Sequence, residues 1–278
     1  MDKIQKIKVS ELFPFPSNPF KVKDDAELEA LTESIRDFGV ICPLIIRHRD
    51  GSGYEIISGH RRTEACKKAG IDEIPAFVRE LDKDTATIAM IDSNLQREHI
   101  LPSERAFAYK MKLDAIKHQG VTCRQVVDKL KSADLLGKET DESGRQVQRY
   151  IRLTELIPSL LELVDEQQIA FSPAVELSYL AQKEQMDLLE VIESEDCTPS
   201  LSQAQRLKKL SAEGRLDMDT IYAILQEAKP NQKEQIKLKK DTIDKFFPKN
   251  YSAQQMEEVI MKLLEQWQRK REKSKDVR

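Results

Sequence analysis

Residues 54–65 read Tyr54-Glu-Ile-Ile-Ser-Gly-His-Arg-Arg-Thr-Glu-Ala65, a stretch in which a strand pattern passes directly into a helix pattern. The apolar residues at its start predict a strand, and Ser58-Gly59 allows a turn into a helix that begins near His60. The free N–H groups of a helix N-terminus, the helix dipole and the forks of Arg61 and Arg62 all favour an anion. The stretch therefore predicts a phosphate site, while ordinary solvated surface remains the alternative.

The residues around this stretch predict a small α/β module. A strand over Leu44 to Arg47 and a strand over Tyr54 to Ile57 form a hairpin across the turn residues Asp50-Gly51-Ser52-Gly53. A helix begins behind the acidic pair Asp24-Asp25 and ends at Gly39, a second runs from about His60 to Gly70, and a third strand covers Ile74 to Val78. Helical spacing marks one face of the first helix, made of Leu28, Leu31, Ile35 and Phe38.

The rest of the chain is predicted to be helical. From about Asp84 onward, helical segments recur between Pro, Gly and Ser/Thr residues. A Lys-rich connection leads to a final helix after Ser252, whose apolar stripe predicts self-association, with packing against the middle domain as the alternative; the stripe consists of Met256, Val259, Ile260, Leu263, Leu264 and Trp267. We therefore expect an α+β protein with domains at 1–100, 101–228 and 229–278.

Composition excludes several classes of protein. The 278 residues are 40% hydrophobic and 33% charged, and no apolar run approaches the roughly 20 residues that span a bilayer. The first residues lack the apolar segment of a signal peptide, so we expect a cytoplasmic protein without a membrane partner. Cys42, Cys66, Cys123 and Cys197 contain no CxxC pair, which argues against a zinc or redox site. The net charge is −3, but residues 231–278 are basic.

A second polar cluster runs from Asp92 to Glu98, at the end of the helix that begins near Asp84. Side-chain amides, a cation and carboxylates crowd within two turns there, as is needed to hold a polyphosphate and its Mg²⁺. A solvated helix C-terminus is the alternative.

Taken together, ordered motifs resemble the ParB family of chromosome and plasmid partition proteins over roughly Ile7 to Leu180. Beside the Gly59 stretch, the resemblance rests on Val9-Ser-Glu-Leu12, Asn18-Pro19, Leu31-Thr-Glu-Ser-Ile35, Gly39-Val-Ile-Cys-Pro-Leu-Ile-Ile-Arg47, Ser93-Asn-Leu-Gln-Arg-Glu98 and Pro102-Ser-Glu-Arg-Ala106. It implies an N-terminal module of the ParB/sulfiredoxin fold that binds CTP, followed by a helix-turn-helix domain that reads a centromere-like DNA site.

Carried onto this chain, the resemblance implies a CTP site with Mg²⁺. The nucleotide would contact Gly59, His60, Arg61, Arg62, Asn94, Gln96 and Arg97, with Asn94 also near the metal and Gly39 to Pro43 near the base. Three residues depart from the family pattern: His60 replaces the usual Glu, Ser93 replaces the Glu before Asn94, and Phe20 replaces a basic residue. Because Ser93 removes an acidic group, we expect at most slow CTP hydrolysis. Asp92 or Glu98 could substitute for it.

The DNA-reading segment is predicted between Val121 and Ile157. Thr122 and Ser143 can each cap a helix, and Arg and Gln side chains pair with guanine and adenine edges. The residues expected at DNA are Thr122, Arg124, Gln125, Ser143, Arg145, Gln146, Gln148 and Arg149. Lys131 to Glu142 is longer than the turn of a compact helix-turn-helix, and an ordinary amphipathic helix is the alternative.

The resemblance therefore predicts a homodimer that loads at a palindromic double-stranded DNA site as a CTP-switched clamp, located at the nucleoid or a plasmid, with a ParA-type ATPase as partner. Three alternatives remain. A transcriptional regulator would keep DNA binding with a vestigial nucleotide pocket. A ParB-like nuclease would need a metal cluster that the sequence does not show. A sulfiredoxin-like enzyme would need a cysteine at position 60, which is His60, whereas Cys66 lies about two turns further along.

Overall fold

The computed structural model describes residues 3–97, 99–120 and 142–227, together with Phe247, Val259, Lys262 and Leu263. The chain divides into two compact units, residues 1–227 and 228–278. The predicted domain boundary at residue 100 falls inside the first unit, where it stays a prediction. Most of the predicted C-terminal helix lies outside the described residues, as do Cys123 and the predicted DNA residues Thr122, Arg124 and Gln125.

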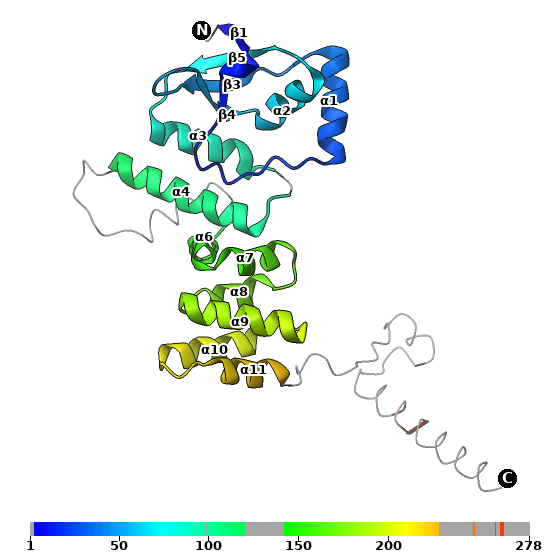
Figure 1. Cartoon of the computed structure of the whole chain (residues 1–278), viewed down its shortest axis with the longest axis vertical. Coiled ribbons are helices and arrows are strands. Elements are labelled where there is room, and N and C mark those ends of the chain that lie inside the picture. The colour runs from blue at the N-terminus through cyan, green and yellow to red at the C-terminus, as the bar shows by residue number, and fades with distance from the viewer. Residues whose placement is uncertain are drawn as a thin grey trace, which may run out of the picture. The chain divides into compact units, whose positions relative to one another are not determined.

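A mixed sheet forms the centre of the N-terminal part of the first unit. Its strand order is β1-β5-β3-β4-β2 (Figure 1), with β1 at Ile4–Lys8, β2 at Leu12–Pro14, β3 at Leu44–His48, β4 at Tyr54–Ser58 and β5 at Glu73–Arg79. β1 pairs antiparallel with β5 and carries Lys6 and Lys8 at one edge of the sheet. β2 pairs parallel with β4 at the other edge and ends at Pro14.

The predicted hairpin is confirmed as β3 and β4, which pair antiparallel with a register shift between Ile45 and Ile46. Arg47 and Glu55 face each other across this pair, and their buried side chains form an ion pair of 2.6 Å. Removing one partner would leave the other charge buried and unpaired, so this pair favours the observed register.

Helices cover both faces of the sheet (Figure 1). α1 (Ala26–Phe38) and α2 (His60–Ala69) pack together on one face, over a core that includes Leu28, Ile56 and Ile74. α3 (Lys83–Leu95) packs on the other face, where Ile57 meets Met90. Adjacent strand residues point to opposite faces, so Ile56 and Ile57 serve the two cores separately. Both sides of the turn at Gly59 are thereby held by packing.

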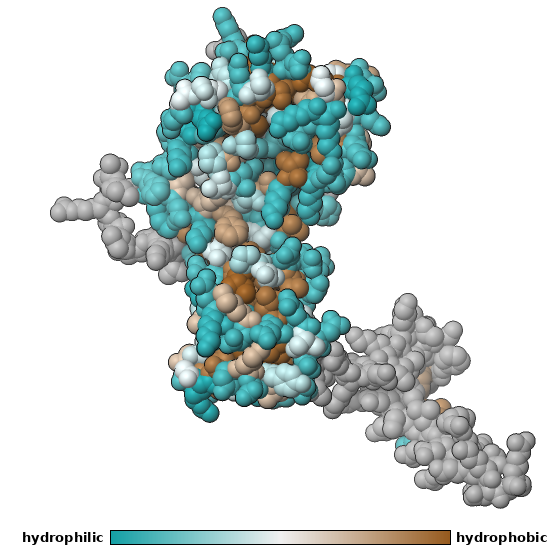
Figure 2. Space-filling model, in the orientation of Figure 1, coloured by the Kyte–Doolittle hydropathy of each residue, from teal (hydrophilic) through white to brown (hydrophobic). Residues whose placement is uncertain are grey.

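The described residues after α3 contain helices and no strand. These are α4 (Pro102–Gly120), α6 (Gly144–Arg152), α7 (Pro158–Asp165), α8 (Phe171–Leu177), α9 (Gln182–Glu195), α10 (Leu201–Ala212) and α11 (Met218–Gln226). A separate hydrophobic core joins α6 to α11, while α4 packs against α3, α6 and α7. In Figure 2 the visible face of these helices carries hydrophilic residues with apolar residues between them. No helix among the described residues has the length and apolar content needed to cross a membrane.

The structure corrects two sequence-based expectations. Phe38, predicted on the buried face of α1, is 75% exposed because it is the last residue of the helix, where Gly39 turns the chain away. Strands β1 and β2 were not predicted. In contrast, the bounds of α2 and the strand over residues 74–78 are confirmed.

Candidate functional site

Gly59 stands between β4 and α2 in a conformation that requires glycine. Its φ is 113°, in the left-handed region, and a Cβ at this position would lie 2.2 Å from Cδ2 of the buried Leu44. As the N-cap, Gly59 offers no side chain to the first-turn N–H groups of α2. Those groups have no intrahelical partner, so the start of α2 is an electropositive surface that a ligand can approach closely.

Arg61 is held by acidic residues at the start of α1. Its two terminal nitrogens donate to Asp25 at 3.2 and 2.9 Å, and one of them also lies 3.4 Å from Glu27. Asp25 is the N-cap of α1 and accepts from the Leu28 N–H. The Arg61 hydrogen bond, followed by that of Leu28, holds the pKa of Asp25 below its usual range. Arg61 therefore lies in the predicted site but with carboxylates as its partners.

Arg62 turns toward the loop before β3. Its guanidinium donates to the carbonyl oxygens of Cys42 at 2.5 Å and Pro43 at 2.8 Å. Burial lowers the pKa of Arg62. The side chain thus fastens the segment predicted near the base to the first turn of α2, which gives Arg62 a structural contact in addition to its predicted role.

His60 is neutral in the folded protein. Its Nε2 accepts a hydrogen bond of 3.4 Å from the Phe15 N–H. Burial, followed by the positive charge of Arg97, lowers the pKa of His60 from 6.5 to about 4. His60 therefore adds no positive charge at neutral pH, and it connects the segment after β2 to the start of α2.

Arg97 follows α3 and approaches the site from the other side of the sheet. Its guanidinium lies 5.7 Å from the centre of the buried Phe20 ring. Burial lowers the pKa of Arg97, Glu104 opposes this effect, and the positive charge of Arg61 lowers the pKa further. Cations from α2 and from the end of α3 therefore act on each other, as expected where an anion is to be held. Gln96, the C-cap of α3, is exposed.

The polar cluster at the end of α3 is partly committed to internal contacts. Asn94 is 3% exposed and donates to the Met90 carbonyl at 2.7 Å, and Ser93 donates to the same carbonyl at 2.8 Å. Asp92 accepts from the buried Lys112 at 2.6 Å. Among the described residues, which exclude Glu98, no three His, Cys, Asp or Glu side chains gather to hold a metal. The assignment of Mg²⁺ to Asn94 stays a prediction.

α6 carries the described part of the predicted DNA-reading segment. Ser143 is its N-cap and accepts from the Gln146 N–H. Arg145 is exposed and makes no hydrogen bond or ion pair with the described residues. In contrast, Arg149 donates to Gln146 and to Ser172 of α8 and lies over the Phe171 ring. Gln148 is half-buried on the same helix. Arg145 is thus available to a ligand, whereas Arg149 supports the fold.

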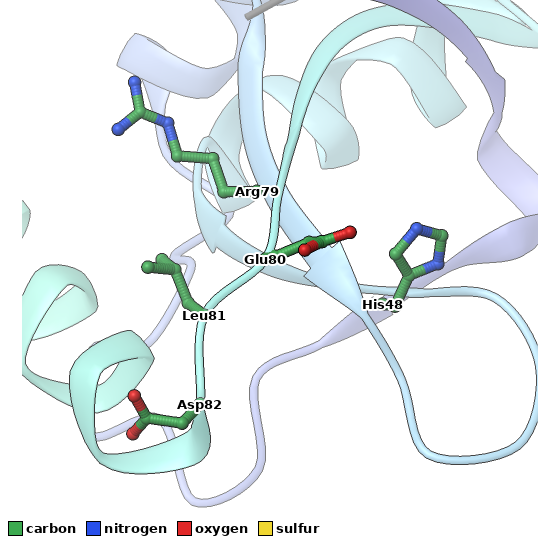
Figure 3. Close-up of a pocket in the computed structure, with 5 residues that line it drawn as sticks. All are labelled: His48, Arg79, Glu80, Leu81 and Asp82. Carbon is green, nitrogen blue, oxygen red and sulfur yellow. The ribbon is translucent and has the colours of Figure 1, made fainter.

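A shallow pocket lies at the opposite end of β4 from Gly59. It is lined by His48, Arg79, Glu80, Leu81 and Asp82. Figure 3 shows the Glu80 carboxylate turned toward the His48 ring, with Arg79 pointing away. Asp82 caps α3 by accepting from the N–H groups of Asp84 and Thr85. This pocket contains none of the residues predicted to form the functional site.

Comparison with known proteins identifies the N-terminal part. Residues 1–95 match the family model of the ParB N-terminal domain. Residues 1–95 are therefore a ParB N-terminal domain. It is 33% identical over 186 residues to stage 0 sporulation protein J of Bacillus subtilis (strain 168), a match that covers 67% of this chain and 61% of the relative. The matched region thus spans less than two thirds of that relative.

Two crystal structures of the C-terminally truncated chromosome-partitioning protein ParB from Caulobacter crescentus are also similar. The one complexed to the centromeric parS site has 20% identity and a TM-score of 0.44, covering 81% of this chain and all of that one. The one complexed with CTP-γ-S has 23% identity and a TM-score of 0.33, covering 69% and 99%.

Within the ParB N-terminal domain, the structure brings together some of the predicted site residues. Gly59, His60 and Arg61 lie at the start of α2, and Arg97 is close enough for its charge to act on His60 and Arg61, whereas Asn94 is buried in α3. Sequence reasoning missed Asp25 and Phe15 as partners of Arg61 and His60. In the sequence Asp25 indicates only a helix start, and no local pattern signals its contact with α2.

Proposed function

We propose that this chain is a partition-type DNA-binding protein whose ParB N-terminal domain binds CTP with Mg²⁺. The observation that carries the proposal is the first turn of α2, whose N–H groups no side chain caps, next to Gly59, where no side chain fits. Arg61 belongs to this turn, and Arg97 lies close enough for the two positive charges to interact. This arrangement is suited to phosphates.

In this proposal the chain acts as a homodimer that loads at a palindromic site in double-stranded DNA, closes as a clamp when CTP binds, and works with a ParA-type ATPase. The triphosphate lies against Gly59, His60, Arg61, Arg62 and Arg97, with Asn94 and Gln96 nearby and Gly39 to Pro43 toward the base. Hydrolysis is at most slow, since Ser93 and Asp92 are engaged in internal contacts. The family match to residues 1–95 supports the domain assignment.

The Arg97→Ala variant tests the nucleotide site. The Arg97 side chain makes no hydrogen bond or ion pair with the described residues, and the backbone hydrogen bond from its N–H to Asn94 is kept by alanine. The substitution should therefore leave the fold intact while CTP affinity falls about tenfold, through the loss of a charge-assisted contact. The measurement is isothermal titration of CTP with Mg²⁺, with ATP, GTP and UTP as comparisons. Arg215→Ala, an exposed arginine beyond α10 that pairs with Glu213, is the control. If the wild-type protein binds no nucleotide, the proposal of a clamp is replaced by that of a transcriptional regulator with a vestigial nucleotide pocket.

The Arg145→Ala variant tests the DNA-reading role of α6. Because Arg145 is exposed and supports nothing in the described fold, its removal should weaken binding to the cognate duplex about tenfold while changing stability by less than about 0.5 kcal/mol. The duplex is selected from a random pool with wild-type protein, and affinity is read by fluorescence anisotropy. Unchanged affinity in Arg145→Ala would remove α6 from the proposed interface.

A further inference from the structure

We propose that Asp25 and Glu27 hold Arg61 in a closed arrangement that the phosphates of a nucleotide must open, so that these two carboxylates limit the affinity of the site. The inference rests on the proposed nucleotide site, and it means that two carboxylates of the chain itself compete with the nucleotide for Arg61. Asp25 and Glu27 thereby become affinity-determining residues outside the predicted binding motifs.

The geometry of Arg61 shows the competition. Both of its terminal nitrogens are committed to Asp25, at 3.2 and 2.9 Å, and the nitrogen at 2.9 Å is shared with Glu27 at 3.4 Å. A guanidinium grips a phosphate through the same paired N–H groups that here grip a carboxylate. A phosphate that binds Arg61 end-on therefore has to displace Asp25.

The local charge also opposes an incoming anion. Arg61 contributes one positive charge, whereas Asp25 and Glu27 contribute two negative charges within hydrogen-bonding distance of it. The three side chains together are negative, although the surrounding N–H groups of α2 and the Arg97 guanidinium favour an anion. Neutralising one carboxylate should consequently strengthen phosphate binding.

Asp25 can lose its charge without losing its second function. Its side chain caps α1 by accepting from the Leu28 N–H at 2.9 Å, and asparagine is an equally good N-cap. The neighbouring Asp24 separately joins the start of α1 to α2 through Lys68. Asp25→Asn therefore removes the ionic contact with Arg61 and preserves the helix start.

The experiment is titration of full-length wild type, Asp25→Asn and Glu27→Gln with CTP and, separately, with inorganic tripolyphosphate, each with Mg²⁺. Asp25→Asn should bind both ligands about three- to tenfold more tightly, and Glu27→Gln about twofold, because its longer contact lies at the surface. Asp82→Asn is the matched control, since Asp82 caps α3 in the same way at the other end of the sheet. It should bind like wild type.

The outcomes separate this inference from the proposed function. Absence of CTP binding in wild type would end both. Binding in wild type with equal or weaker affinity in Asp25→Asn would retain the nucleotide site and overturn the inference, as would a gain for CTP without a gain for tripolyphosphate. Thermal unfolding by circular dichroism checks each fold. If Asp25→Asn were to unfold, Glu27→Gln, which plays no part in the cap, decides by the direction of its affinity change.

Discussion

Replacing Gly59 with alanine should lower the free energy of unfolding by about 3 kcal/mol and abolish CTP binding. The new Cβ would lie 2.2 Å from Cδ2 of Leu44, which is fully buried in the core and would have to be displaced against its packed neighbours. Forcing a side chain into a packed core costs roughly 1–3 kcal/mol, and the left-handed backbone adds roughly 1–2 kcal/mol for a residue with a Cβ. Relief of the contact would also shift the start of α2, where the phosphates are proposed to bind.

Gly51→Ala is the matched control for this variant. Gly51 has a φ of 109°, close to the 113° of Gly59, but a Cβ there would meet nothing within 4 Å. Alanine at position 51 therefore introduces backbone strain of about 1 kcal/mol without a steric clash, and it should leave CTP affinity unchanged. Urea unfolding followed by far-UV circular dichroism compares the two. Equal losses of stability would show that contact with Leu44 is not what excludes a side chain at position 59.

The stability of the protein should fall as the pH is lowered from about 6.5 to about 4, by as much as about 3 kcal/mol from His60 alone. The pKa of His60 is about 4 in the folded protein and 6.5 when the ring is exposed, so the unfolded chain takes up a proton in this window and the folded chain does not. The loss of stability begins as the pH falls below about 6.5 and is complete near pH 4. Its size follows from the lowered pKa of His60, since each pKa unit corresponds to about 1.4 kcal/mol.

His60→Gln isolates this effect. The glutamine amide oxygen can accept from the Phe15 N–H but does not titrate, so unfolding measured from pH 4 to 7 should show a flatter stability profile than wild type. His48→Gln, at the exposed last residue of β3, is the control for the same change of residue type away from α2. If the stability of His60→Gln changed with pH as steeply as that of wild type, folding would not lower the pKa of His60.

The hairpin and α2 could be predicted because their signals are local. Residues 44–48 and 54–58 are apolar runs on either side of a Gly-rich turn, and Gly59 and Gly70 bracket α2. Strands β1 and β2 could not be predicted in the same way. Only Ile7 is buried in β1, and β2 has three residues, so neither shows an alternating pattern. Their pairing with β5 and β4 depends on residues more than 40 positions away.

The site residues could also be predicted only where their signal is local. The glycine and the cations of residues 59–62 and 97 are visible in the sequence because their residue types are unusual together. Their partners are not visible, since the Arg61–Asp25 and His60–Phe15 contacts join residues 36 and 45 positions apart. Phe20 appeared only as a departure from the family pattern, and the structure shows it as buried support for the Arg97 guanidinium.

The edges of the sheet restrict how copies of this chain can associate. β2 is short and ends at Pro14, which has no N–H to offer, and β1 presents Lys6 and Lys8 beside its open hydrogen-bonding groups. Short edge strands, proline and lysine are the features by which proteins prevent a sheet from being extended by a strand of another molecule. Copies of this chain held close together would thus resist aggregation through the edges of the sheet.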